Sequence, residues 1–291
     1  MEGRRCDATV VIPARDEAHR IGVQLAALTA QDYGGDWEVV VADNGSTDGT
    51  GDTALGWTGR LPRLRVVRAG HPGVNSARNA GARAARGRIV AFCDADDEAT
   101  PTWLSGLVAA CADTDIAGGY LDPVALNSPR TRASRPANPP DRLPLIMGWL
   151  PYATGACMAV RTEVFTALGG FDETYTGGGG DDVELCVRAQ LAGHTVGFAP
   201  GAVVRYRLRD GLWPLARQQI GYGRADARLL RDFRAHGLTV NSTAEAAREW
   251  LGLLARAGHL RDPDRAGPWV CETAWRLGRL RGSLEQRVWC P

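Results

Sequence analysis

The chain has 291 residues, 44% of them hydrophobic, and a formal net charge of +1, which is ordinary for a globular protein. All 34 basic residues are arginine, which excludes a Schiff-base lysine, a Walker-A lysine and a lysine general base. Electrostatic stabilisation of a bound phosphate must therefore come from arginine, a metal ion or backbone N–H groups.

The cysteines and the apolar segments indicate the compartment. The seven cysteines are scattered and never spaced as Cys-x-x-Cys, which predicts buried thiols in a reducing environment. No long apolar core precedes the first expected strand, so we expect no signal peptide. The longest uncharged run, 143–160, is interrupted by proline and glycine and is a poor membrane span. We expect a cytoplasmic protein, at most peripheral to the inner face of the membrane.

Strand-like and helix-like segments alternate through the first hundred residues. Apolar, β-branched runs predict buried strands, and apolar residues at helical spacing predict helices. Such alternation is typical of a parallel, doubly wound α/β sheet with right-handed crossovers. The expected strands are 8–12, 37–42, 64–67 and 89–93, and the expected helices are 17–31 and 73–86.

The middle of the chain continues the sheet and contains one long irregular segment. Residues 127–141 are rich in Ser, Pro, Arg and Asn and are predicted to form a mobile loop, of the kind that serves as a lid or binding loop. The expected strands are 116–121, 155–160, 195–199 and 203–206, and the expected helices are 102–111, 162–168 and 181–191.

From residue 211 onward the pattern is helical, with helices expected at 212–234, 243–257 and 269–281. Residues 201–291 carry 16 arginines against 9 acidic residues. A basic surface of this kind is suited to weak contact with anionic lipid or with a charged acceptor. The alternative is a solvated face over packed helices.

The expected strand 89–93 ends in four acidic residues, Asp94, Asp96, Asp97 and Glu98. Carboxylates this close together repel one another and resist burial unless a cation or hydrogen-bond donors compensate them. An Asp-Ala-Asp could hold a divalent metal through oxygen ligands, and the metal could hold a diphosphate. The alternative is a solvated acidic turn that caps a helix starting at 100–101.

Three further polar segments favour a ligand site over a capping turn. Asp16-Glu17 and Asp43-Asn44 also follow expected strands, and the carboxyl ends of parallel strands lie along the edge where ligands bind. Asp181 and Asp182 open an expected helix after the glycine run 177–180. A plain helix cap explains these two aspartates, but the glycines would also let a ligand come close to the backbone.

Six segments, in this order, resemble the motifs of family 2 glycosyltransferases of GT-A fold. The resemblance covers about residues 8–235. The first two are Val11-Ile-Pro-Ala-Arg-Asp-Glu17, similar to VIPxxNE, and Val40-Val-Ala-Asp-Asn-Gly-Ser-Thr-Asp-Gly-Thr50, similar to VVDDGSTDGT. The others are Ser76-Ala-Arg-Asn-Ala-Gly81 (xARNxG), Asp94-Ala-Asp96 (DxD), Gly155 to Glu173 (GANMAxRR…GGFDE) and Gly180-Asp-Asp-Val-Glu-Leu185 (GEDxDL).

The resemblance implies an inverting, nucleotide-sugar-dependent enzyme of hexosyl- or N-acetylhexosaminyl-transferase type. Its fold would be Rossmann-like α/β, with a mixed, mainly parallel sheet, flanking helices and a helical C-terminal extension. Residues 1–210 would form the catalytic domain, divided into a nucleotide-binding half, 1–98, and an acceptor-binding half, 99–210. Residues 211–291 would be the extension.

The resemblance also implies the roles of residues at matching positions. Asp94 and Asp96 would hold Mn²⁺ or Mg²⁺, which neutralises a leaving diphosphate in a chain without lysine. Asp182, with Asp181 beside it, would be the general base, because inversion in one displacement needs a carboxylate on the far face of the sugar. The nucleotide-sugar-binding residues would be Pro13, Ala14, Glu17, Asp43, Arg78, Asp94 and Asp96.

The chain departs from the family pattern at one metal contact. Family members often carry a histidine near the strand after the base helix, and residues 203–207 contain none. His194 precedes that strand, where a structural role is expected. We expect weaker metal affinity, or Arg205 in place of part of the metal's charge.

Other enzyme classes fit the motifs less well. A nucleotidyltransferase would carry a glycine-rich loop with a basic residue after the first strand, and a Rossmann oxidoreductase would carry Gly-x-Gly-x-x-Gly there. Neither acidic segment has the spacing of a calcium-binding loop. A non-catalytic sugar-nucleotide-binding relative is the alternative to an enzyme. We expect UDP in the donor, no nucleic-acid partner, and an acceptor under the 127–141 loop that is a small molecule, a carrier-bound intermediate, a glycan or a lipid.

Overall fold

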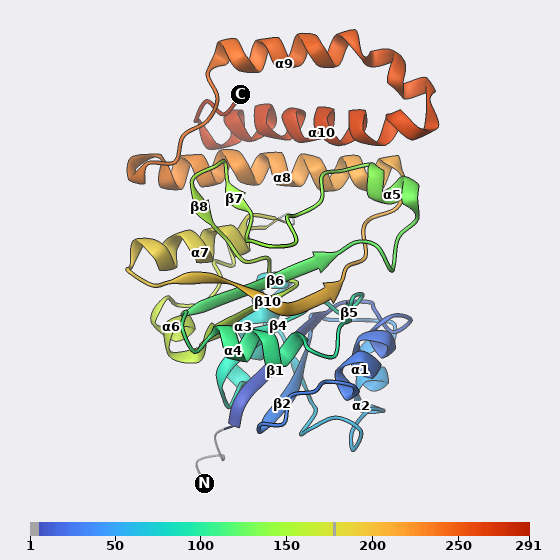
Figure 1. Cartoon of the computed structure of the whole chain (residues 1–291), viewed down its shortest axis with the longest axis vertical. Coiled ribbons are helices and arrows are strands. Elements are labelled where there is room, and N and C mark those ends of the chain that lie inside the picture. The colour runs from blue at the N-terminus through green and yellow to red at the C-terminus, as the bar shows by residue number, and fades with distance from the viewer. Residues whose placement is uncertain (1–5, 177–178) are drawn as a thin grey trace.

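The computed structural model describes residues 6–176 and 179–291, and its centre is one eight-stranded sheet (Figure 1). The strand order is β3-β2-β1-β4-β9-β6-β10-β5. The strands are β1 (Cys6–Ala14), β2 (Trp37–Asp43), β3 (Arg65–Arg68), β4 (Gly87–Phe92), β5 (Glu98–Ala99), β6 (Ile116–Asp122), β9 (Met158–Arg161) and β10 (Val196–Arg205). A separate hairpin consists of β7 (Leu145–Ile146) and β8 (Leu150–Pro151).

The first four strands form the parallel half of the sheet, as predicted. β1 pairs in parallel with both β2 and β4, and β3 pairs in parallel with β2. The apolar runs of β1 and β2 are buried along almost their whole length, because helices cover both faces of the sheet. The parallel pairing brings the carboxyl ends of β1, β2 and β4 to one edge.

The second half of the sheet corrects the expectation of an all-parallel sheet and confirms the mixed one. β9 lies antiparallel between β4 and β6, and β5 pairs antiparallel with β10. An apolar run reads the same in either direction, so strand polarity could not be predicted from the pattern. β10 is one continuous strand and not two, with a register shift between Phe198 and Val203 around Pro200, which cannot donate a ladder hydrogen bond.

Helices pack on both faces of the sheet, and each face has its own buried core. One core joins the sheet to α1 and α4, and the other joins it to α3, α6 and α7. The helices are α1 (Ile21–Thr29), α2 (Thr50–Leu55), α3 (Val74–Ala84), α4 (Trp103–Ala110), α5 (Pro129–Ala133), α6 (Thr162–Ala167), α7 (Asp181–Leu191), α8 (Leu212–Phe233), α9 (Thr243–Ala255) and α10 (Pro263–Gln286), with 3-10 turns η1 (Arg234–His236) and η2 (Ala257–Arg261).

The structure differs from the sequence interpretation at three places: the loop 127–141, the alternative helix start at 100–101 and the start of the last helix. The segment 127–141 contains the short helix α5, because the Ser128 hydroxyl accepts a 3.1 Å hydrogen bond from the Thr131 N–H and caps it. No helix starts at 100–101, because residues 98–99 pair with β10 as β5 and α4 begins at Trp103. α10 begins six residues before the predicted start, with Pro263 in its first turn.

The C-terminal helices form a layer beside the sheet, with α8 and α10 next to each other and α9 outermost (Figure 1). Their close approach depends on glycine. A Cβ at Gly223 of α8 would lie 2.0 Å from the Trp275 carbonyl oxygen of α10, and one at Gly278 would lie 2.4 Å from the Ile220 carbonyl oxygen. Within the described residues, no helix combines the length and the apolar character needed to cross a bilayer.

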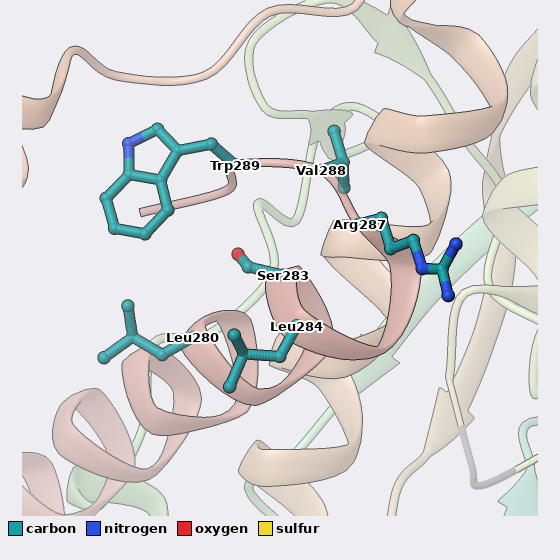
Figure 2. Close-up of a pocket in the computed structure, with 6 residues that line it drawn as sticks. All are labelled: Leu280, Ser283, Leu284, Arg287, Val288 and Trp289. Carbon is teal, nitrogen blue, oxygen red and sulfur yellow. The ribbon is translucent and has the colours of Figure 1, made fainter.

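Many arginines of this helical layer are ion-paired. Arg276 bridges Glu249 and Glu272, and Arg224 pairs with Glu285. These pairs favour the interpretation of the basic excess as a solvated, packed surface. A shallow apolar pocket of about 310 Å³ lies near the C-terminus, between α10 and the segment that follows it, and contains none of the predicted site residues (Figure 2). All seven cysteines are buried free thiols, as predicted.

Candidate active site

A cavity of about 990 Å³ lies where the carboxyl end of β4 meets the N-terminus of α7. It brings together four of the predicted site residues, Arg78, Asp94, Asp181 and Asp182. The loop around α5 and the helices α8 and α10 supply its other walls. Residues of α8 and α10 therefore line the candidate site.

Arg78 on α3 lines this cavity and forms ion pairs with Asp94 and Asp181. Its Nη1 donates a 2.8 Å hydrogen bond to Asp181 Oδ2, and its Nη2 donates a 3.1 Å bond to Asp94 Oδ1. Burial opposes its charge, but the carboxylates outweigh burial and raise the pKa of Arg78 above its usual value. Gly155 leaves room for the guanidinium, since a Cβ there would lie 2.7 Å from Arg78 Cζ.

Asp182 is the second residue of α7 and its carboxylate is half-buried. Its Oδ2 accepts a 2.9 Å hydrogen bond from the Gly155 N–H, and its Oδ1 accepts one of 2.9 Å from the Val183 N–H. Burial, and then the charge of Asp181, raise the pKa of Asp182 to about 6. The group is therefore ionised at neutral pH and more basic than an ordinary aspartate, which suits proton abstraction.

Asp96 forms a second acidic group with Glu17, outside the large cavity. Arg20 Nη1 lies 3.9 Å from Asp96 Oδ2 and 3.6 Å from Glu17 Oε2. Burial and the charge of Asp94 raise the pKa of Asp96, and burial and the charge of Asp96 raise that of Glu17. Glu17 Oε2 is buried without a hydrogen-bond partner among the described residues. The pKa values of both acids stay raised although Arg20 and Arg209 lower them, so this group is short of positive charge.

The donor set fits a divalent metal that is shared with a ligand. Among the described residues no three His, Cys, Asp or Glu side chains form a metal-binding group. Asp94 and Asp96 offer hard oxygen ligands, and Mg²⁺ in proteins is often held by one or two carboxylates together with substrate phosphates. A cation here would also relieve the repulsion that raises the pKa of Asp96.

Asp97 departs from the expectation of an acidic segment at the solvent rim. It is completely buried, and its Oδ1 accepts a 2.7 Å hydrogen bond from the Arg207 N–H. Burial, followed by the charges of Asp94 and Asp96, raises its pKa well above the usual range. Asp97 therefore ties the segment after β10 to the end of β4 and is not part of a solvated cap.

The remaining predicted nucleotide-binding residues lie at the ends of β1 and β2. Pro13 and Ala14 end β1, and the Ala14 carbonyl oxygen accepts a 2.9 Å hydrogen bond from the Asn44 N–H. Asp43 ends β2 and accepts a 2.9 Å bond from the Ser46 N–H. Asp16, where the family has Asn, adopts a φ of 54°, a conformation that both residues tolerate. None of these residues lines the large cavity.

Two further sequence expectations concern the missing histidine. His194 Nδ1 lies 3.3 Å from Asp115 Oδ2, just before the start of β6 and so at the opposite end of that strand from Asp122, which supports a structural role. Arg205 pairs with Glu98 and not with Asp96. The cations near Asp96 are Arg20 and Arg209, whose charges lower its pKa. The glycine run before α7 is partly outside the described residues, since 177 and 178 are not described.

Several residues of the cavity wall were missed by sequence analysis. Tyr222 and Gln218 lie one turn apart on α8, and the Gln218 amide donates a 3.0 Å hydrogen bond to the Tyr222 hydroxyl. Burial, and then the charge of Asp182, raise the pKa of Tyr222 to about 12. In the sequence, the four-residue spacing of Gln218 and Tyr222 is only a weak indication that they share a helix face. No local sequence pattern indicates that α8 would reach Asp182. The other missed wall residues are Arg132, Arg135, Tyr152, Trp213, Arg217 and Trp275.

Comparison with known proteins identifies the family of the chain. The family model described as glycosyl transferase family 2 matches residues 9–169, and one described as the N-terminal domain of galactosyltransferase matches residues 147–209. Validoxylamine A glucosyltransferase of Streptomyces hygroscopicus subsp. jinggangensis is 33% identical in an alignment of 219 residues, and the match covers 64% of this chain and 51% of that protein. The chain thus spans about half the length of this relative.

Two solved structures share the fold over nearly the whole chain. The mannosyltransferase PcManGT from Pyrobaculum calidifontis, in complex with GDP-Man and Mn²⁺, is 22% identical with a TM-score of 0.63 and covers 98% of this chain and 89% of its own. TarS 1–349 of S. aureus, in complex with UDP-GlcNAc, is 17% identical with a TM-score of 0.56 and covers 97% and 92%. The mixed, curled sheet with flanking helices is therefore the GT-A fold.

Proposed function

This chain belongs to glycosyl transferase family 2, and we propose that it moves a sugar from a nucleotide diphosphate to an acceptor hydroxyl with inversion at the sugar carbon. The observation that carries the proposal is the carboxylate of Asp182. It is half-buried, accepts hydrogen bonds from two backbone N–H groups, has a pKa of about 6, and shares a cavity with Asp94.

Asp182 is the proposed general base. A single displacement needs a base on the face of the sugar opposite to the leaving diphosphate, and Asp182 takes the acceptor's proton at one of its carboxylate oxygens. Asp181 remains paired with Arg78, and its charge keeps Asp182 basic. The Gly155 N–H and the positive charge of Arg78 act in the opposite direction and lower the pKa of Asp182.

The donor is proposed to lie along the ends of β1, β2 and β4. Pro13, Ala14, Glu17 and Asp43 would bind the nucleoside, and Arg78 would lie beside the sugar diphosphate. Asp94 and Asp96 would hold Mn²⁺ or Mg²⁺, which supplies positive charge to the leaving diphosphate. UDP is the proposed nucleotide, with a hexosyl or N-acetylhexosaminyl group. Two solved structures of the same fold, one in complex with GDP-Man and the other with UDP-GlcNAc, support a nucleotide-sugar donor.

The proposed division of labour follows the chain. Residues 1–98 bind the nucleotide, residues 99–210 supply the base and the loop around α5 that covers the acceptor, and residues 211–291 form the helical extension. The extension contributes Tyr222 and Trp275 to the cavity wall, which supports a role for it in acceptor binding. The acceptor is proposed to enter under the 127–141 segment.

A thermal-shift screen tests the donor assignment. A ligand that binds only the native state raises the melting temperature, by an amount that grows with its concentration relative to Kd. We expect UDP-sugars with Mn²⁺ to stabilise the protein, and the same sugars with EDTA to stabilise it less. UDP released from the stabilising donor is then measured as turnover. A protein that no sugar nucleotide stabilises would overturn the proposal, and donor binding without turnover would indicate a non-catalytic sugar-nucleotide-binding protein.

A further inference from the structure

Five arginines line the large cavity, and only one of them has an acidic partner. Arg78 pairs with Asp94 and Asp181. The other four form no ion pair with a carboxylate among the described residues. They come from α5, from the segment after α5, from the segment after β10 and from α8, and they are Arg132, Arg135, Arg209 and Arg217.

Arg132 and Arg135 are partly buried although they lack a counterion. Arg132 Nε is buried without a hydrogen-bond partner. Among the described residues, Arg135 donates hydrogen bonds only to neutral groups: 2.9 Å to Gln218 Oε1, 2.6 Å to the Arg209 carbonyl oxygen and 3.2 Å to Ser134 Oγ. Burial lowers its pKa. Removing a charge from water without an opposite charge is unfavourable. A bound anion would supply the missing counterion.

A chain of hydrogen bonds places this positive region on the same cavity wall as Asp182. Arg135 donates to Gln218, and Gln218 donates a 3.0 Å bond to the Tyr222 hydroxyl. Asp182, Tyr222 and Arg135 all line the large cavity, so one bound molecule can contact the proposed base and Arg135 together.

Arg209 belongs to the other side of the site. It follows Arg207 by two residues, and Arg207 Nε donates a 3.0 Å hydrogen bond to the Asp96 carbonyl oxygen, beside the residues proposed to bind the donor. Arg132 and Arg135 instead lie on or next to α5, and Arg217 lies on α8. Trp213, which is 77% exposed at the start of α8, offers an apolar surface next to them.

We propose that the acceptor is an anion whose phosphate or carboxylate group binds to Arg132, Arg135 and Arg217 while its hydroxyl group faces Asp182. Guanidinium groups match both oxyanions with paired hydrogen bonds. This inference rests on the proposed function, since it assigns the acceptor class of the same site.

Binding of three matched sugars to the UDP-saturated protein tests the inference without turnover. Glucose 6-phosphate, glucuronate and glucose are titrated at constant ionic strength in the presence of UDP and Mn²⁺, which keep the donor side occupied. At least one of the two anions should bind about tenfold or more tightly than glucose, the gain expected of charge-assisted hydrogen bonds. The preferred anion tells phosphate from carboxylate.

Arginine variants assign that preference to the proposed residues. Arg132→Gln alone, and together with Arg135→Gln, should lower the affinity for the anion to that for glucose and leave the affinity for UDP unchanged. The Arg132 side chain has no hydrogen bond or ion pair with any described residue, so its variant should fold normally, and UDP-induced stabilisation verifies this. Arg130→Gln is the matched control, because Arg130 lies on the same helix, donates to the Pro263 carbonyl oxygen and does not line the cavity.

The possible failures are distinct. Equal binding of the three sugars, no binding of any, or an anion preference that survives both variants would overturn the anionic acceptor. An equal loss of UDP affinity in the variants would overturn it too, because the arginines would then hold the donor diphosphate. A protein that binds no nucleotide would instead overturn the proposed function, and UDP binding is measured first for that reason.

Discussion

Arg78 Nη1 and Asp181 Oδ2 form a buried 2.8 Å ion pair that joins residues 103 positions apart in the chain. The same guanidinium holds Asp94 at 3.1 Å, so α3, the end of β4 and the start of α7 meet at one side chain. The proposed metal-binding segment and the helix that carries the proposed base are therefore held at a fixed separation by Arg78.

Replacing Arg78 by methionine should destabilise the protein by about 3–5 kcal/mol, because it leaves Asp181 buried without a counterion. Urea denaturation measures the loss. Adding Asp181→Asn should restore a large part of it, since the double variant has neither charge. Asp181→Asn is also measured alone. If the stability losses of the two single variants add up to that of the double variant within about 0.5 kcal/mol, Arg78 and Asp181 are not coupled as an ion pair.

The pH dependence of turnover should follow Asp182. Its pKa is raised to about 6, so UDP release from the donor should increase as the pH rises from about 5 to 7 and then level off. Arg78→Met removes a charge that lowers this pKa, and should move the rising limb to higher pH. A pH–rate profile without a limb near pH 6 argues against Asp182 as the base.

The raised pKa of Asp182 also affects stability. Protonation of Asp182 stabilises the fold, and this contribution is lost as the pH rises from about 4 through about 6.

Asp96→Asn should weaken UDP binding in the presence of Mn²⁺ by at least about tenfold. Even mutations of groups that only hydrogen-bond to a metal's ligands have effects of that size. It should have little effect when EDTA is present. Calorimetric titration of UDP under both conditions measures the difference. Asp52→Asn is a suitable control, because Asp52 is a surface residue of α2 with no side-chain hydrogen bond or ion pair among the described residues. Equal UDP affinity with and without metal would contradict a role for Mn²⁺ in UDP binding.

Gly223→Ala should destabilise the protein and impair turnover together. The new Cβ would lie 2.0 Å from the Trp275 carbonyl oxygen and would push α8 from α10, and overpacking of this kind costs about 1–3 kcal/mol. Gly258→Ala, where a Cβ would meet nothing within 4 Å, is the matched control. If turnover is unchanged while stability falls, the helical extension is a support and not a wall of the acceptor site.

The parallel half of the fold and the acids at its edge could be predicted from local pattern. Buried strands such as β1 and β2 are uninterrupted apolar runs, and polar residues that follow such runs must lie at the sheet edge. The resemblance to family motifs implies the roles of Asp94, Asp96 and Asp182. Of these, Asp94 and Asp182 line the same cavity as Arg78, and Asp96 lies outside it.

The other half of the site depends on contacts that no local pattern contains. The antiparallel direction of β9 is invisible in an apolar run. The burial of Asp97 depends on the Arg207 N–H, more than a hundred residues away. The wall formed by Arg135, Gln218 and Tyr222 arises because glycines let α8 and α10 pack closely and because α5 caps itself within a segment that reads as loop.

The most direct test of the account is to measure UDP release and UDP affinity on one Asp182→Asn variant, using the sugar nucleotide that stabilises the protein most. The variant keeps the shape of the side chain and one of its two oxygens and removes the basic site. Turnover should fall by about two to four orders of magnitude, while the Kd for UDP with Mn²⁺ stays within about twofold of the original. Undiminished turnover, or a parallel loss of UDP binding, would contradict the assignment of Asp182 as the base.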